Sequence, residues 1–180
     1  MSLHIALLRG VNVAGAGPVT AQALSELLET LGLTSPRSGP GAGDLVFESP
    51  ERTGAELQAL LESELHGRLG LRTDVYVRTA EAWRAMIAAN GFADFAETDP
   101  GWLTAIFLKD AADRKAVGVL RAAARNQEQV RAESRQLYIA YPNGPARSKL
   151  NNALIEKTLG GRVTSRPWTS VLALADMLDS

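Results

Sequence analysis

The sequence contains no cysteine among its 180 residues, which excludes disulfide scaffolds, thiolate metal sites and cysteine nucleophiles. It has no excess of charge of one sign, because 19 basic and 20 acidic residues leave a net charge of −1. No overall field therefore favours nucleic acid or an anionic membrane. The sequence also lacks a basic leader and any apolar run near the roughly 20 residues that span a bilayer. These absences predict a soluble cytoplasmic protein.

The composition that remains is that of a globular protein, with 46% hydrophobic and 22% charged residues. The charges are unevenly distributed along the chain. Residues 1–100 carry seven Arg, no Lys and thirteen acidic residues, whereas residues 101–180 carry twelve basic and seven acidic residues. This change of sign indicates two halves, although chance clustering on solvated helix faces would give the same distribution.

Hydrophobic periodicity predicts the element order βαββαβ in the first half. Strands are expected at residues 3–8, 35–39, 44–48 and 73–78. Thr20 is expected to cap the first helix and Gly32 to end it, while Thr53 and Glu56 form a capping box at the start of the second. A linking helix with Trp83 on one face follows.

The second half repeats the same order. Strands are expected at residues 102–108, 127–131, 136–140 and 162–164, with helices at 111–124, after Ser148 and from Thr169. Such a unit closes as an antiparallel sheet of order 4-1-3-2 with two helices on one face. Pro36 and Pro40 then fall at an edge strand, where proline is tolerated.

We therefore predict an α+β protein of two tandem ferredoxin-like halves, antiparallel sheets with helices packed on one face. The expected divisions are a first half at 1–79, a linking helix and loop at 80–100, and a second half with a C-terminal helix at 101–180. The two halves share no obvious residue identity, so the repeat is inferred from the order of elements alone.

Five short segments resemble the bacterial family called domain of unknown function 1697. They are Leu7–Val13, Asp44–Ser49, Tyr141–Gly144, Arg147–Leu150 and Arg166–Thr169. The resemblance implies a bacterial protein of two ferredoxin-like halves and implies no established activity. The sequence departs from the family pattern at residues 14–18, 39–44 and 167, where glycine, alanine or proline largely replaces the usual polar side chains.

The strongest candidate for a binding site is a basic segment at an expected helix start. Arg147 and Lys149 supply positive charge, and Ser148, which is expected to cap the helix, supplies a hydroxyl. Asn143 lies in the preceding Tyr-Pro-Asn-Gly turn. In the alternative interpretation, Ser148 is an ordinary cap and both charges are solvated.

Two further polar residues follow the first strand, namely Arg9 and Asn12. An arginine at the end of a buried strand must reach solvent, pair with a carboxylate such as Asp44, or face a ligand. We hypothesise that one anionic small molecule binds between the halves. Its expected ligand-binding residues are Arg9, Asn12, Asn143, Arg147, Ser148 and Lys149.

Other functional signals are weak. The glycine-rich segment 10–20 matches neither nucleotide-binding fingerprint. His4 and His66 have no metal-ligand spacing, so neither a metal site nor a cofactor is expected. No serine lies in a nucleophile elbow. Trp83, Trp102 and Trp168 are interpreted as packing residues.

Two other function classes remain open. The protein could be an enzyme acting on a phosphorylated or carboxylated metabolite with catalytic residues that the sequence does not identify. It could also bind nucleic acid through the basic second half, although the near-zero net charge and few aromatic residues disfavour this. No membrane partner is expected, and the sequence does not indicate an oligomeric state.

Overall fold

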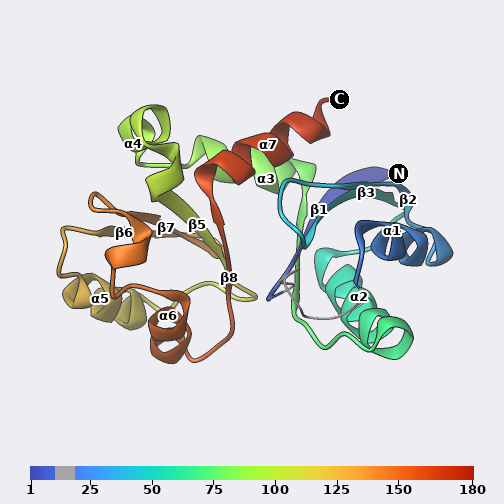
Figure 1. Cartoon of the computed structure of the whole chain (residues 1–180), viewed down its shortest axis with the longest axis horizontal. Helices are drawn as coiled ribbons and strands as arrows, with labels where there is room; N and C mark the ends of the chain where they lie inside the picture. Colours follow the sequence, from blue (N-terminus) through green and yellow to red (C-terminus); the bar gives the residue numbers. More distant parts are fainter. Residues whose placement is uncertain (11–18) are drawn as a thin grey trace. The chain divides into compact units, whose positions relative to one another are not determined.

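The structure is a computed structural model that describes residues 1–10 and 19–180 (Figure 1). Asn12 and most of the glycine-rich segment therefore lie outside the described residues. The described chain forms two compact units, of which unit 1 comprises Met1–Ala85 with Leu172–Ser180 and unit 2 comprises Met86–Val171. The division at residues 79 and 101 stays a prediction.

Unit 1 contains an antiparallel sheet of order β2-β3-β1-β4, which confirms the predicted topology. Its elements in chain order are β1 (Ser2–Leu8), α1 (Ala21–Thr30), β2 (Thr34–Ser38), β3 (Asp44–Ser49), α2 (Gly54–Leu69), β4 (Val75–Thr79) and the start of α3 (Ala80–Ala88). Pro36 lies in β2 at the edge of the sheet, where it interrupts no central ladder.

Local sequence signals begin α1 and α2 of unit 1 as predicted. The Thr20 hydroxyl accepts a hydrogen bond from Ala23 N at 3.0 Å. Thr53 and Glu56 form the expected capping box, with Thr53 N donating to the Glu56 carboxylate at 2.7 Å. The helices bury leucines against alternate residues of the strands, among them Ala6, Leu8, Leu45, Phe47, Val75 and Val77.

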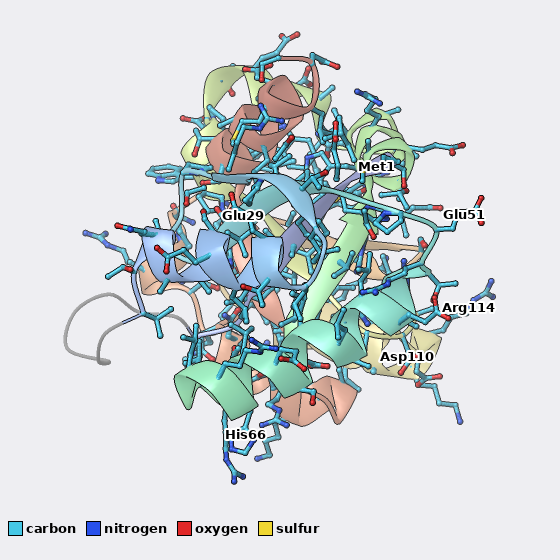
Figure 2. All side chains as sticks on the ribbon, turned by 90° about the vertical axis from the view of Figure 1, so that its right-hand side faces the viewer. Met1, Glu29, Glu51, His66, Asp110 and Arg114 are labelled. Atoms are coloured by element: carbon cyan, nitrogen blue, oxygen red, sulfur yellow. The ribbon has the colours of Figure 1, made fainter. Side chains whose placement is uncertain are left out.

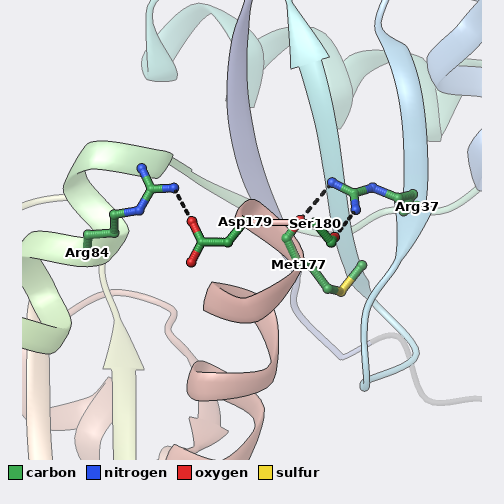
Figure 3. Close-up of polar contacts among 5 residues, drawn as sticks. All are labelled: Arg37, Arg84, Met177, Asp179 and Ser180. Atoms are coloured by element: carbon green, nitrogen blue, oxygen red, sulfur yellow. Dashed lines mark hydrogen bonds and ion pairs between the residues drawn. The ribbon is translucent and has the colours of Figure 1, made fainter.

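The end of α7 (Trp168–Leu178) belongs to unit 1 and is held there by two arginines (Figure 3). Arg37 of β2 donates to Met177 O at 2.9 Å and to the Ser180 hydroxyl at 2.7 Å. Arg84 of α3 forms an ion pair with Asp179 at 2.8 Å. Because Arg84 and Asp179 are both largely exposed, the main-chain bond from Arg37 is the stronger anchor.

Unit 2 repeats the topology with the sheet order β6-β7-β5-β8, which confirms the tandem repeat. Its elements are α4 (Ala93–Thr98), η1 (Pro100–Trp102), β5 (Leu103–Phe107), α5 (Arg114–Ala123), β6 (Gln129–Glu133), β7 (Gln136–Ala140), η2 (Pro145–Arg147), α6 (Asn152–Leu159) and β8 (Thr164–Pro167). The repeat extends to register, because Ile5 pairs with Arg78 as Ala105 pairs with Arg166. Helices α5 and α6 cover one face of this sheet through Val117, Leu120 and Ile155.

Several predicted boundaries in unit 2 are wrong by one to three residues. The strand expected from residue 127 begins at Gln129, because Gln127 has a positive φ of 66° and turns the chain. The last strand begins at Thr164, because Val163 N instead donates to the Glu156 carboxylate at 2.8 Å. The final helix begins at Trp168, one residue before the expected Thr169.

Two of the three tryptophans interpreted as packing residues are buried, and the third is partly exposed. Trp83 and Trp168 are 0% and 2% exposed, but Trp102 is 43% exposed at the end of η1. No helix within the described ranges is both long and apolar enough to cross a membrane.

Candidate ligand-binding site

The loop that carries most of the predicted site residues connects β7 to α6 in unit 2 (Figure 1). Gly144 N donates to Tyr141 O at 3.0 Å and closes a tight turn. Gly144 has a φ of 85°, a conformation that glycine adopts without the strain a side chain would bring. The short helix η2 follows at once, so the loop is compact and regular.

A buried carboxylate just before β6 holds this loop. Glu128 is 8% exposed and accepts hydrogen bonds from the Ser148 hydroxyl at 2.7 Å and from Asn126 N at 2.5 Å. The Ser148 oxygen also accepts from Leu150 N at 3.0 Å. The serine hydroxyl is therefore committed to the loop itself and does not point a proton at a ligand.

Two amide side chains extend the network. Asn126 Nδ2 donates to Arg147 O at 3.2 Å, and Asn143 Nδ2 donates to Asn126 O at 2.9 Å. These bonds fix the main chain on both sides of η2. They leave the Arg147 guanidinium uninvolved.

The surroundings of Glu128 favour its ionised form. Burial by itself would raise the pKa of this carboxyl, but hydrogen bonds from Ser148 and from nearby main-chain amides outweigh burial and hold the pKa below 4.5. Glu128 is therefore negatively charged at neutral pH. Its charge is compensated by donors and not by a cation of the predicted site.

Tyr141 anchors the other end of the loop. Its hydroxyl donates to Leu150 O at 2.7 Å and is buried. Burial, reinforced by the negative charge of Glu128, raises the pKa of Tyr141 well above the ordinary 10.0. Tyr141 is therefore a neutral structural hydroxyl and is not poised as an acid or base near neutral pH.

Ser148 does not cap α6, which corrects the expectation from the sequence. The cap is Asn151, whose side-chain oxygen accepts a hydrogen bond from Leu154 N at 2.9 Å. The three residues from Ser148 to Leu150 instead extend the loop, because Ser148 bonds Glu128 and Leu150 N. The pair Asn151-Asn152 ahead of the apolar Leu154 was the sequence signal for this start.

The two predicted cations of this segment are both exposed. Neither Arg147 nor Lys149 makes a side-chain hydrogen bond or ion pair with another residue in the described part of the chain. Their positions differ from the expectation in one respect, because they lie ahead of the helix start and not in its first turn. Both can accept an anion without first breaking an existing contact.

Arg9 follows β1 in unit 1. Its main-chain N–H donates to Asp74 O at 3.0 Å, and its carbonyl accepts a hydrogen bond from the Thr73 hydroxyl. Asn12 lies outside the described residues. That Arg9 and Asn12 share a ligand with Arg147 stays a prediction.

A pocket of about 340 Å³ lies at the start of α6 in unit 2. Its size is within the range of small-ligand sites. Its walls carry hydroxyl and amide groups beside proline rings, from Gly101, Thr104, Tyr141, Pro145, Leu150, Asn151, Asn152, Ser165 and Pro167. Asn152 donates to the Ser165 hydroxyl at 3.1 Å across it, and Lys149 immediately precedes the lining residue Leu150. A phosphate or carboxylate fits such neutral donors with cations nearby.

The histidines are engaged elsewhere. His4 is buried and stacks on Phe47 with ring centroids 5.8 Å apart. His66 is exposed on α2, as Figure 2 shows, and accepts a hydrogen bond from Arg72 Nε at 3.0 Å. Across residues 1–10 and 19–180, no three His, Cys, Asp or Glu side chains gather as metal ligands would.

Comparison with known proteins gives a family and a fold. The family model described as "Protein of unknown function (DUF1697)" matches residues 1–138. The structure is similar to that of the conserved bacterial protein SP0830 from Streptococcus pneumoniae, with a TM-score of 0.77 and 18% identity over 98% of each chain. No match was found among the curated proteins. Because the model covers well over half of the sequence, the chain belongs to the DUF1697 family of proteins of unknown function.

Proposed function

We propose that this protein binds a small anionic ligand, and that the β7–α6 loop of unit 2 supplies the charge that recognises it. The observation that carries the proposal is the state of Arg147 and Lys149. Both are exposed and have no side-chain partner in the described ranges, on a loop whose main chain is fixed by Glu128, Asn126 and Asn143. Because the main chain of the loop is already ordered, binding an anion costs the conformational entropy of the two side chains and not that of the loop.

The neighbouring pocket supports the same function. Arg147 offers the planar fork that matches a phosphate or carboxylate, and Lys149 adds a compact charge. Pocket groups such as Thr104, Asn152 and Ser165 can hydrogen-bond the rest of a polar ligand. In this proposal the loop binds the anionic group of the ligand, and the pocket has room for the rest of a molecule larger than a bare ion.

In the hypothesis from the sequence, the same ligand also contacts Arg9, Asn12 and the other half of the chain. We include this wider site in the proposal. Separate variants of Arg9 and Arg147 distinguish it from a site confined to unit 2.

A thermal-shift titration tests the proposal with inorganic phosphate, ribose 5-phosphate and nucleotides. A ligand at 100 times its dissociation constant adds about 2.7 kcal/mol of stability, which gives a measurable shift. We expect Arg147→Ala and Lys149→Ala to remove the shift. Arg9→Ala removes it only if the wider site exists.

The matched controls are Arg114→Ala and Lys115→Ala, a second exposed basic pair of unit 2 that lies on α5 (Figure 2 labels Arg114). These variants should keep the full shift. An equal loss in both pairs would mean that only general positive charge matters, and it would overturn the proposal. A steep salt dependence with an oligonucleotide would instead favour nucleic-acid binding.

A further inference from the structure

The exposed indole of Trp102 is the feature that the proposed function does not use. Every tryptophan of the sequence is described, and Trp102 is the only one at the surface, at 43% exposure against 0% for Trp83 and 2% for Trp168. An exposed indole contributes less hydrophobic free energy to folding than a buried one, so an exposed tryptophan is a candidate for binding. Trp102 also directly follows Gly101, which lines the pocket at the start of α6.

Trp102 is fixed against the loop that carries the cations. Its carbonyl accepts a hydrogen bond from Tyr141 N at 2.9 Å. A Cβ placed on Gly144 would lie 3.6 to 3.7 Å from three atoms of the indole, Cε2, Cζ2 and Nε1. Nearly equal distances to three atoms of a planar ring place Gly144 over the face of the ring, so the turn supports one side of the indole.

Arg147 is the third residue after Gly144, along the short helix η2. A 3₁₀-helix rises about 2 Å per residue, so the backbone of Arg147 lies within roughly 6 Å of Gly144 along that axis. The turn at Gly144 that supports the indole of Trp102 therefore leads directly into the short helix that carries Arg147. The pocket lined by Gly101, Pro145 and Asn152 adjoins both segments.

We propose that the anionic ligand of this site is a nucleotide, whose base stacks on Trp102 while its phosphate binds Arg147 and Lys149. This inference rests on the proposed anion-binding function and adds the class of ligand to it. A supported, partly exposed indole is a stacking platform that any base can use, because every base has a π-face. The hydroxyl and amide groups of the pocket then form hydrogen bonds with the sugar of the nucleotide.

Calorimetric titration of the full chain with four compounds tests the inference: inorganic phosphate, ribose 5-phosphate, adenosine and AMP. We expect AMP to bind more tightly than each of the others. Trp102→Ala should weaken the binding of AMP about tenfold, or about 1.4 kcal/mol, and leave the affinity for ribose 5-phosphate unchanged. Trp102→Phe keeps a stacking ring and should retain most of the affinity, and its thermal unfolding without ligand checks that the fold is intact.

Fluorescence provides a second readout, because acrylamide reaches an exposed indole and spares the two buried ones. Bound AMP should protect the wild-type emission from acrylamide, and inorganic phosphate should not. The Trp102→Phe variant should show little quenching with or without AMP.

The outcomes separate this inference from the proposed function. If ribose 5-phosphate binds through Arg147 but AMP is no tighter and Trp102→Ala has no effect, the anion site stands and the nucleotide inference is overturned. If AMP and adenosine bind equally and Arg147→Ala has no effect, both proposals are overturned. The absence of any binding overturns both, and a single-stranded oligonucleotide that binds far more tightly than AMP overturns the inference of a mononucleotide.

Discussion

The Ser148 hydroxyl donates a hydrogen bond to Glu128 at 2.7 Å, and the two residues lie 20 positions apart in the sequence. This contact ties the β7–α6 loop to the chain just before β6. It gives the ionised carboxylate a donor in its buried position and engages Ser148, while Asn151 caps α6. The order of the loop around Arg147 therefore depends on Glu128.

The first prediction concerns Glu128 and pH. Glu128→Gln should lower the free energy of unfolding at neutral pH by about 1–3 kcal/mol, because a neutral amide replaces the charged acceptor of these hydrogen bonds and one carboxylate oxygen becomes a donor. The pKa of Glu128 lies below its ordinary value of 4.5 in the folded protein, so its ionisation stabilises the fold fully above pH 4.5. That contribution is lost as the pH falls below 4.5 through the lowered pKa.

Urea unfolding of the wild type and of Glu128→Gln across this pH range provides the measurement. The difference between them should shrink as the solution becomes more acidic. The exposed Glu133 of β6 supplies the control Glu133→Gln, which should change stability little at any pH. A difference for Glu128→Gln that is constant with pH would contradict the prediction.

The second prediction concerns Tyr141 at alkaline pH. Burial raises the pKa of Tyr141 well above 10.0 in the folded protein, and it also raises the pKa of Tyr138. The unfolded chain then loses these protons more readily than the folded chain, so stability should fall as the pH rises through 10.0.

Ultraviolet difference spectroscopy during alkaline titration follows the ionisation directly. Tyr141→Phe should cost about 1 kcal/mol at neutral pH, because Leu150 O loses its hydrogen bond, and should reduce the alkaline loss of stability. A wild-type titration with all tyrosines ionising near 10.0 would refute the assignment.

The third prediction compares two glycines. A Cβ on Gly39 would lie 2.7 Å from Asp44 Cβ and 2.7 Å from Leu174 Cδ2, whereas a Cβ on Gly118 would meet nothing within 4 Å. Gly39→Ala should therefore destabilise the protein by about 1–3 kcal/mol through overpacking. Gly118→Ala, in the interior of α5, should stabilise it by about 0.5–1 kcal/mol. The measurement is the thermal unfolding of both variants. Melting temperatures that shift in the same direction in both would contradict the prediction.

The fourth prediction concerns the end of α7. Arg37→Ala removes the hydrogen bonds to Met177 O and Ser180, so amide hydrogen exchange in the last turn of α7 should become faster. The exposed pair Arg68–Glu64 on α2 offers the control Arg68→Ala, which should leave α7 unchanged. Unaltered exchange near Met177 in Arg37→Ala would show that apolar packing alone holds the helix.

Much of the fold could be predicted from the sequence because its signals are local. The Thr53–Glu56 capping box spans three residues, and Pro36 marks an edge strand by its missing N–H. The repeated order of elements then allowed few topologies. Both sheets have the predicted order.

The site was less predictable because its contacts are not local. Arg147 and Lys149 could be chosen from their charge, but the bond between Ser148 and Glu128 joins residues that no helical or strand period relates. The exposure of Trp102 likewise depends on a turn some forty residues later, since its indole lies against Gly144. Tryptophan is usually buried, so the residue type predicted burial, but the tertiary structure leaves this side chain partly exposed.

Unit 1 includes Leu172–Ser180, which the ribosome makes long after Ala85. At about 5–20 residues per second, the wait between these points is on the order of ten seconds. During that interval unit 1 lacks two leucines of α7, Leu174 and Leu178, which are buried in the finished protein. Because the whole of unit 2 is made between these two segments, the first unit to be started is the last to be completed.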